Sequence, residues 1–324
     1  MPGMVEVENL SKSFGTLRAV DGVSLTVSKG EVLGFLGPNG AGKTTTMRMI
    51  AGFLTPSSGT ARICGNDVVQ DPTAVKRCLG YMPEGSPSYD DMTVAAFLGF
   101  IAEIRGLSGA DAGARVRAVA ERLDLTDVLD RTIDVLSKGY KRRVGLAQAI
   151  IHDPPVLILD EPTDGLDPNQ KHQVRSLIAE MADEKAIIIS THILEEVQAV
   201  CSRAVVIGQG RVLADGTAMD LLRRLPDFTA VSIVLPKTAA ANAATVMRQL
   251  PGVAAIFETP LDSERTKLRM TPRDGVFLLD EVNRAVRFNA IPATEVYRDG
   301  GTLDDAFRMI TTGNEVQMES SHAA

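Results

Sequence analysis

A glycine-rich octapeptide has the clearest chemical pattern in the chain. It consists of Gly37-Pro38-Asn39-Gly40-Ala41-Gly42-Lys43-Thr44, between the apolar run Val32–Leu36 and a predicted helix from about Lys43 to Ala51. The glycines let the backbone curl so that several N–H groups point at phosphate oxygens, and the helix start adds its positive dipole end. Lys43 is expected to reach the β- and γ-phosphates, Thr44 to ligate Mg²⁺, and Thr45 to donate to a phosphate. The octapeptide therefore predicts a nucleoside triphosphate site.

Two carboxylates follow the apolar run Val156–Leu159. Asp160 and Glu161 would lie at the carboxyl edge of a parallel strand, where α/β sheets bind their ligands. Asp160 is placed to hold Mg²⁺, directly or through water, and Glu161 to polarise an attacking water as general base. The alternative is that two acids at a strand end cap a neighbouring helix.

A third segment, Leu136-Ser137-Lys138-Gly139-Tyr140, opens a predicted helix over Lys138–Ile151. Ser137 could be the N-cap of that helix, and a capped helix start is also an anion site, so both roles can hold together. Within one chain, nothing in the sequence requires this segment to lie near Gly37–Thr45.

Leu136–Tyr140, followed by Arg142-Arg143-Val144, resembles the signature motif of ABC-type ATPases, and the other motifs occur in that family's order. The resemblance covers about residues 4–220, some two thirds of the chain. It implies a P-loop α/β fold that binds ATP with Mg²⁺ and hydrolyses the nucleotide.

The resemblance assigns roles to further residues. Phe14 is the aromatic that stacks on adenine, with Val20 beside it, and Glu84 occupies the Q-loop position and could ligate Mg²⁺. Asp167 is the D-loop aspartate, and His192 is the switch histidine that contacts the γ-phosphate. Phe14 could instead be a core residue. Asp167, followed by Pro168 and Gln170, is also a good helix start with a capping box.

The chain departs from the commonest family pattern at three of these positions. Glu84 replaces a glutamine, so an amide becomes a charged acceptor that can ligate Mg²⁺ but cannot donate to the attacking water. Lys138 and Tyr140 replace a glycine and a glutamine of the signature. This variant, with a C-terminal α+β extension, is similar to the ATPases that drive ABC-2-type exporters, including those of the gliding-motility type.

The resemblance also implies partners. Two copies would pair head to tail, each ATP being held by Gly37–Thr45 of one chain and by Ser137 and Gly139 of the other. Lys138 adds a positive charge near the expected γ-phosphate, where it either helps to bind the nucleotide or is simply solvated. The region Glu84–Met92 would receive a separate membrane permease, which places the protein in the cytoplasm, peripheral on the inner face of the membrane. The alternative is a soluble ABC ATPase that acts on nucleic acid or ribosomes.

Composition weighs against that alternative. The 324 residues carry a net charge of −7, which disfavours a broad nucleic-acid surface.

Cys64, Cys78 and Cys201 lack metal-ligand spacing and are expected to be reduced, as in the cytosol. The chain has neither a signal-peptide pattern nor an apolar stretch of the roughly 20 residues that cross a bilayer.

These motifs need a sheet to position them. Apolar runs typical of strands buried on both faces occur at Val32–Leu36, Val156–Leu159, Ala186–Ile189 and Ala204–Ile207. Runs that alternate, as in a partly exposed antiparallel sheet, occur at Val5–Leu10, Val23–Val27 and Ala61–Cys64. A helical lobe over about 91–151 is predicted from Thr93–Arg105, Ala110–Leu123 and Lys138–Ile151.

The composition shifts near residues 223–227, so we expect an ABC ATP-binding domain over 1–225 and an accessory domain over 226–312. Strands are predicted at Thr229–Leu235, Val253–Glu258, Lys267–Met270 and Ala293–Tyr297, and helices at Ala239–Leu250, Asp274–Phe288 and Leu303–Ile310. This order suits a ferredoxin-like α+β domain. Residues 313–324 are expected to be a flexible tail.

Overall fold

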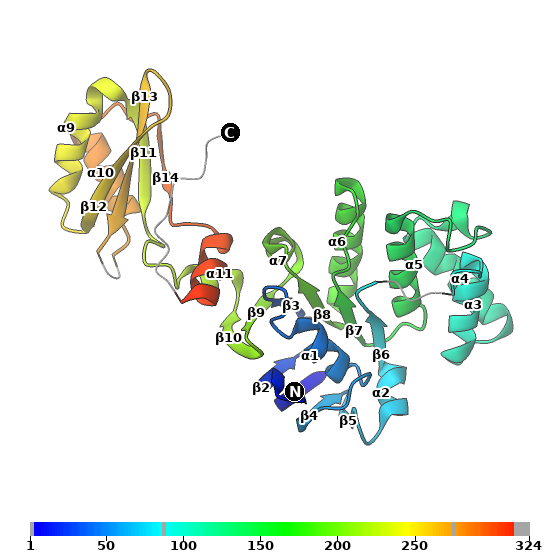
Figure 1. The fold of residues 1–324 in the computed structure, drawn as a ribbon. Helices are drawn as coiled ribbons and strands as arrows, with labels where there is room; N and C mark the ends of the chain where they lie inside the picture. The colour runs from blue at the N-terminus through cyan, green and yellow to red at the C-terminus, as the bar shows by residue number, and fades with distance from the viewer. Residues whose placement is uncertain (1–2, 86–88, 274–275, 314–324) are drawn as a thin grey trace. The chain divides into compact units, whose positions relative to one another are not determined.

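The computed structural model describes residues 3–85, 89–273 and 276–313. The chain divides into two compact units, Met1–Ala218 and Met219–Ala324, and each is described by itself. Figure 1 shows the elements of both units.

A six-stranded sheet forms the centre of the first unit. Its strands are β3 (Val32–Leu36), β6 (Leu79–Met82), β7 (Val156–Asp160), β8 (Ala186–Thr191), β9 (Arg203–Gly208) and β10 (Arg211–Gly216). Their order is β10-β9-β3-β8-β7-β6, and only β10 is antiparallel to its neighbour. Every residue of β3, β7 and β8 is buried, as expected of strands that are covered on both faces.

Alternate residues of each central strand belong to different cores. Leu157 and Leu159 join a cluster with the helical part of the unit, whereas Val156 and Ile158 join a cluster on the opposite face. The side-chain period of two in a strand makes this division unavoidable.

The strands β6 and β10 were not predicted from the sequence. β6 has only four residues and includes Gly80, whose missing side chain lets the neighbouring helix pass close by. A Cβ at Gly80 would lie 2.1 Å from the carbonyl oxygen of Ala149. β10 is an edge strand with exposed positions, so it lacks the apolar run that marks its neighbours.

A second, antiparallel sheet contains β1 (Val5–Phe14), β2 (Leu17–Val27), β4 (Ser58–Ile63) and β5 (Asn66–Asp67), in the order β2-β1-β4-β5. Helix α1 (Lys43–Ile50) contributes Met47, Met49 and Ile50 to the core cluster that this sheet shares with the central one. Helix α2 (Pro72–Cys78) leads from β5 into β6.

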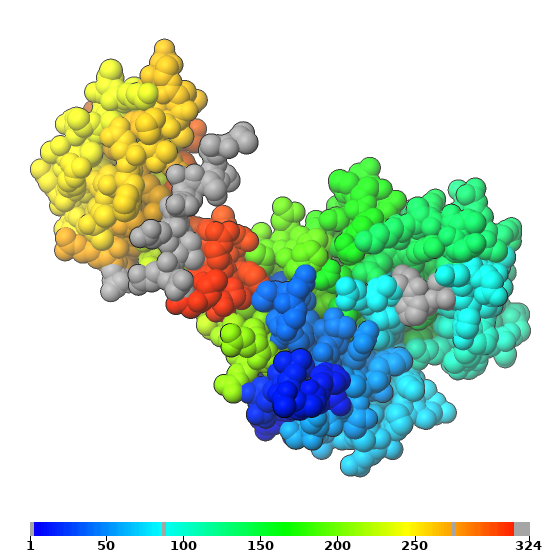
Figure 2. Space-filling model, in the orientation of Figure 1, coloured from blue at the N-terminus to red at the C-terminus, as the bar shows by residue number. Residues whose placement is uncertain are grey.

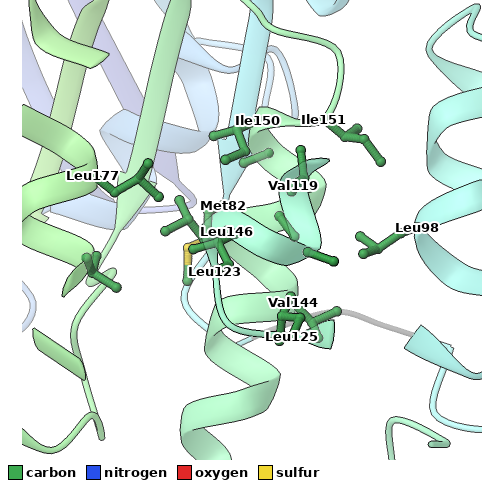
Figure 3. Close-up of a cluster of buried hydrophobic side chains, with 14 of the residues drawn as sticks. Met82, Leu98, Val119, Leu123, Leu125, Val144, Leu146, Ile150, Ile151 and Leu177 are labelled. Carbon is green, nitrogen blue, oxygen red and sulfur yellow. The ribbon is translucent and has the colours of Figure 1, made fainter. Parts of the chain in front are cut away.

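The expected helical lobe is present. It contains α3 (Val94–Ile104), α4 (Gly109–Arg122), the 3₁₀ turn Thr126–Val128 and α5 (Lys138–Ile150). Figure 2 shows α3, α4 and α5 gathered on one side of the first unit. Their core includes Leu98, Val119, Leu123, Val144 and Leu146, with Met82 of β6 and Leu177 of a later helix (Figure 3). Helices α6 (Pro168–Ala182) and α7 (Leu194–Val200) complete this unit, and α8 (Ala218–Leu222) crosses into the next.

The second unit has the predicted ferredoxin-like topology. Its elements are β11 (Val231–Pro236), α9 (Lys237–Arg248), β12 (Val253–Pro260), β13 (Arg265–Pro272), α10 (Leu279–Phe288), β14 (Glu295–Arg298) and α11 (Leu303–Thr312). The strand order is β12-β13-β11-β14, and all neighbours are antiparallel. Apolar residues of the sheet, α9 and α10 form a separate core.

One predicted helix boundary in this unit is wrong. Helix α10 begins at Leu279, not at Asp274; residues 274–275 lie outside the described residues, and 276–278 are not helical. The N–H of Val276 bonds to the carbonyl of Arg273 at 3.1 Å, and its carbonyl accepts from Thr229 Oγ1 at 2.6 Å. Because Thr229 uses that carbonyl, the segment forms a turn before the helix starts. The predicted tail lies outside the described residues beyond Gly313.

Candidate functional site

The predicted site segments follow four neighbouring parallel strands at their carboxyl ends. The glycine-rich loop follows β3, Glu84 follows β6, and His192 follows β8. Asp160 is the last residue of β7, and Glu161 comes directly after it. The register pairs Leu36 with Thr191 and Asp160 with Ser190, so these ends are level with one another. The topology therefore brings the phosphate loop, both carboxylates and the histidine to one edge of the sheet.

Two glycines of the phosphate loop are required by close backbone approach. A Cβ at Gly37 would lie 2.5 Å from the carbonyl oxygen of Ile207. Gly42 is the N-cap of α1 with φ of 103°, and a Cβ there would lie 2.6 Å from the carbonyl oxygen of Ala19. Val20, the residue after Ala19, is fully buried in the core beneath the loop. The cradle is thus shaped by main-chain contacts with β2 and β9.

Lys43 is the cation of the loop. Its side chain is buried, and Nζ donates to the carbonyl oxygens of Gly37 at 2.7 Å and Pro38 at 3.2 Å. Burial lowers the pKa of Lys43, whereas the negative charges of Glu161, Asp160 and Glu84 act in the opposite direction. A phosphate group would add further negative charge beside this ammonium, and Thr44 and Thr45 lie next to it at the start of α1.

Asp160 fits the predicted magnesium site. It is 1% exposed; one carboxylate oxygen accepts from Ser190 Oγ, and the other, Oδ2, is buried without a hydrogen-bond partner. A buried carboxylate oxygen without a partner is costly, and a cation or its water would satisfy it. Mg²⁺ takes few protein ligands beside substrate phosphates, so a single buried carboxylate oxygen such as Oδ2 of Asp160 is compatible with it.

Glu161 and His192 are in direct contact. Nδ1 of His192 lies 2.9 Å from the carboxylate of Glu161, and the histidine is about half exposed while the glutamate is mostly buried. Glu161 has a φ of +52°, which is uncommon for a residue other than glycine. Its N–H donates to the carbonyl oxygen of Ser190 at 3.0 Å. A carboxylate with an imidazole beside it can hold and pass a proton.

Phe14 and Glu84 both present their side chains to solvent. The Phe14 ring is 49% exposed near the end of β1, with Lys12 Nζ 5.4 Å from its centroid, so it is not a core residue. Glu84 is exposed at the end of β6. The Phe14 ring is therefore exposed enough to stack on a ligand.

The signature segment is not part of this cluster. Ser137 is exposed and caps α5, its Oγ accepting from the N–H of Tyr140 at 3.3 Å. Lys138 Nζ pairs with Asp164 Oδ2 at 2.8 Å, and this hydrogen bond is the main reason that the pKa of Asp164 is lowered. In the part of the chain that the structure describes, no hydrogen bond or ion pair joins Ser137–Gly139 to the phosphate loop.

The capping box predicted at Asp167 is only half formed. Asp167 Oδ1 accepts from the N–H of Gln170 at 2.9 Å and so caps α6. The side chain of Gln170 lies beside Gly139 instead, where a Cβ would come within 2.6 Å of its Oε1. The second bond of a capping box, from the Gln170 side chain to the backbone N–H of Asp167, is therefore replaced by packing of Gln170 against the signature segment.

Ser190 and Arg142 are two site residues to which the sequence alone assigned no role. Ser190 is fully buried and contacts both Asp160 and Glu161. Arg142 is 4% exposed and donates to main-chain carbonyls of both those residues. The position of Ser190 two residues before His192 could have predicted that it lies at the site. No local sequence pattern predicts which residues Arg142 contacts.

This fold and edge define the class of the protein as a P-loop nucleoside triphosphatase. Residues 20–164 match the family model described as ABC transporter. The chain is 40% identical over 222 residues to the Nod factor export ATP-binding protein I of Paraburkholderia xenovorans (strain LB400), covering 67% of this chain and 72% of that protein. It is 33% identical over 311 residues to the daunorubicin resistance ATP-binding protein DrrA3 of Streptomyces coeruleorubidus, covering 95% of each.

A solved structure of an ATP-binding subunit of an ABC transporter superposes with a TM-score of 0.64 at 32% identity, over 68% of this chain and 92% of that one. The chain belongs to the family of ABC transporter ATP-binding proteins and is an ATPase of that type. The predicted fold class is confirmed. No helix among the described residues combines the length and the apolar character that crossing a membrane requires.

Proposed function

We propose that this chain is the ATP-hydrolysing subunit of an exporter of the ABC-2 type, and that two copies pair around two ATP molecules. The observation that carries the proposal is the division of the site. The phosphate loop, Asp160, Glu161 and His192 meet at one sheet edge, whereas Ser137 and Lys138 are exposed and have their hydrogen bonds elsewhere in the same chain, and Gly139 is buried beside Gln170. A second copy would supply its own Ser137–Gly139 to the phosphates held by Gly37–Thr45. The relatives named for Nod factor export and daunorubicin resistance support an export role.

In the proposed reaction, a water adds to the γ-phosphorus of ATP and gives its proton to Glu161. The bond from that phosphorus to the β-phosphate oxygen breaks, and ADP and phosphate are released. Lys43 and the N–H groups of the loop bind the β- and γ-phosphates, and His192 contacts the γ-phosphate while it orients Glu161. Bound Mg²⁺, held by Thr44, Asp160 and Glu84, would neutralise the developing phosphate charge. Asp167 would contact the partner copy, and Phe14 would stack on adenine.

A separate membrane permease is proposed to dock at Glu84–Met92 and the start of α3, which would keep the protein at the inner face of the membrane. Residues 86–88 of this region lie outside the described residues. Support comes from an exposed aromatic group beside them: Tyr89 is 56% exposed and Phe100 38% exposed, with ring centroids 5.8 Å apart. Exposed aromatic side chains are enriched where proteins dock.

The test is Glu161→Gln in the full chain, with Glu195→Gln as the matched control, since Glu195 is an exposed acid just after His192. The amide keeps the size of Glu161 but cannot take a proton, so kcat should fall by at least about 100-fold. ATP binding should persist, and ATP should hold the variant as a dimer, because bound ligand stabilises the state it prefers. ATP turnover, equilibrium binding and sedimentation with ATP measure these three effects.

The control variant should hydrolyse ATP like the wild type and dissociate after turnover. Normal turnover by Glu161→Gln would remove the general-base assignment. A Glu161→Gln protein that binds ATP but stays monomeric at every concentration would contradict the proposed dimer.

A further inference from the structure

Arg142 connects helix α5 to the catalytic strand end through main-chain hydrogen bonds. Its guanidinium is 4% exposed, and one terminal nitrogen donates to the carbonyl oxygens of Glu161 and of Asp160, the latter at 3.2 Å. The other terminal nitrogen reaches the carbonyl of Pro83 at 3.5 Å. One side chain thus contacts the ends of β7 and β6 together, the two segments that carry Glu161 and Glu84.

The main chain at Glu161 requires such support. A φ of +52° is strained for a non-glycine residue, so the surroundings must hold it there. The N–H of Glu161 donates to the carbonyl of Ser190 at 3.0 Å, and its carbonyl oxygen accepts from Arg142 and from the N–H of Asp164, the latter at 3.2 Å. With both peptide groups held, the carboxylate of Glu161 lies 2.9 Å from Nδ1 of His192.

The bonding of Arg142 is unusual for a buried cation. Among the ion pairs of the described residues, none includes Arg142. Burial lowers the pKa of Arg142, and the nearby charges of Asp164, Glu161, Asp160 and Glu84 act against that shift. A buried guanidinium remains charged, and removing it from water is expensive. Here its two terminal nitrogens donate to main-chain carbonyls at the site, whereas Nε is buried without a hydrogen-bond partner.

A second contact strengthens the same junction. Lys138 lies four residues before Arg142, so the two side chains share a face of α5. Its Nζ pairs with Asp164 at 2.8 Å, and its stem covers Gly165, where a Cβ would lie 2.6 Å from Lys138 Cδ. The first turns of α5 therefore contact the chain from Asp160 to Gly165 at several points.

We propose that Arg142 is a positioning residue of ATP hydrolysis, which holds the peptide of Glu161 so that the carboxylate faces the attacking water. It also ties Glu161 to the helix that begins at Ser137, the segment that completes the partner copy's site. The inference rests on the proposed role of Glu161 as general base.

The test compares Arg142→Gln with Arg143→Gln in the full chain. Arg143 is the matched control because it lies on the same helix, is 6% exposed, and donates to the carbonyls of Leu123 at 3.0 Å and Asp124 at 3.2 Å, away from the site. Arg142→Gln should lower kcat by at least about tenfold, because small misplacements of a catalytic group are costly. The KM and Kd for ATP should change less than about twofold, since the phosphate loop is untouched.

Arg143→Gln should keep kcat within about twofold of the wild type, even where it loses as much thermal stability. Arg142→Lys and Arg143→Lys provide a second pair that keeps the charge and a donor. Arg142→Lys should recover part of the kcat lost in Arg142→Gln, because an ammonium can still donate to a carbonyl.

Equal losses of kcat in the Arg142 and Arg143 variants would overturn the inference, and so would a wild-type kcat in Arg142→Gln. If either glutamine variant fails to fold, the lysine pair decides between these outcomes in the same way. Normal turnover by Glu161→Gln is a separate result, since it would remove the general base itself and not its positioning.

Discussion

Buried charges at the carboxyl edge of the sheet dominate the molecule at the scale of single residues. Lys43 is 7% exposed and Asp160 1% exposed, and both are held by groups that also shape the loop or the strand end. Burying such charged groups in a hydrophobic core would cost desolvation free energy. In a site that binds phosphate and a cation, however, charges interact more strongly because water is excluded. The orphaned oxygen of Asp160 is the sharpest sign of this requirement.

A half-buried histidine outside the site, His152, predicts how stability depends on pH. His152 Nε2 lies 3.2 Å from the carbonyl of Leu79, while Nδ1 is buried without a partner. Burial, followed by the charge of Arg105, lowers the pKa of His152 from 6.5 to about 4. Between those two pH values the unfolded chain binds the extra proton, so the free energy of unfolding should fall as pH drops from 6.5 toward 4.

His152→Gln should remove this loss, because the amide can still donate to Leu79 without gaining charge. Between pH 7 and pH 5 the wild type should lose about 1 kcal/mol more than the variant, allowing for partial exposure of the ring. Urea unfolding at both pH values measures the difference. His172→Gln, at an exposed position on α6, is the control and should behave like the wild type. Parallel pH curves for wild type and His152→Gln would contradict the assignment.

At the scale of elements, the conformation of the phosphate loop at the start of α1 depends on contacts with β2 and with the turn between β9 and β10. The loop follows a fully buried strand, and its turn at Gly42 abuts Ala19 of β2. The N–H of Gly210, in the turn between β9 and β10, donates to the carbonyl of Ala41 at 3.0 Å. The cradle is therefore held by both sheets, and its glycines are not equivalent.

Gly42→Ala should be far more harmful than Gly40→Ala. Both positions have positive φ, 103° and 78°, which costs alanine roughly 1–2 kcal/mol. A Cβ at Gly40 meets open space, whereas one at Gly42 would lie 2.6 Å from the carbonyl oxygen of Ala19, so the loop must shift.

We therefore expect Gly42→Ala to destabilise the protein by at least about 3 kcal/mol and to weaken ATP binding at least about tenfold. Gly40→Ala should destabilise the protein only by about the cost of the backbone strain. Denaturant unfolding and ATP titration provide the comparison. Equal losses of stability in the two variants would show that backbone strain, and not the contact with β2, determines the cost.

At the scale of the whole molecule, the chain holds separate cores. The two clusters of the first unit use buried residues up to Ile207, and the cluster of the second unit uses residues from Val231 to Ile291. A domain that has its own core can in principle fold alone. We propose that residues 226–312 form an accessory domain that clamps the dimer, binds a regulatory small molecule or contacts the permease.

Deletion of residues 226–324 should leave a folded ATPase unit. Because all site residues and both of their cores remain, ATP affinity should stay within about threefold of the full chain. Equilibrium ATP binding and thermal unfolding measure this, and sedimentation of the Glu161→Gln form with ATP reports whether the dimer survives. A fragment that is folded but fails to bind ATP would contradict the independence of the first unit.

The sequence by itself determined the chemistry and the order of the motifs. Glycines at Gly37, Gly40 and Gly42, a lysine at a helix start and two acids after an apolar strand are local patterns, and local sterics and dipoles are enough to interpret them. The same holds for the central strands, whose apolar runs reflect burial on both faces.

Only the tertiary structure decided which distant groups meet. The bonds from Arg142 to Asp160 and Glu161, the pair of Lys138 with Asp164, and the packing of Gln170 on Gly139 all join residues that are at least 18 positions apart in sequence. The short strand β6 and the edge strand β10 likewise depend on their neighbours. Local patterns act over a few residues, whereas these contacts exist only because packing against the shared core brings the segments together.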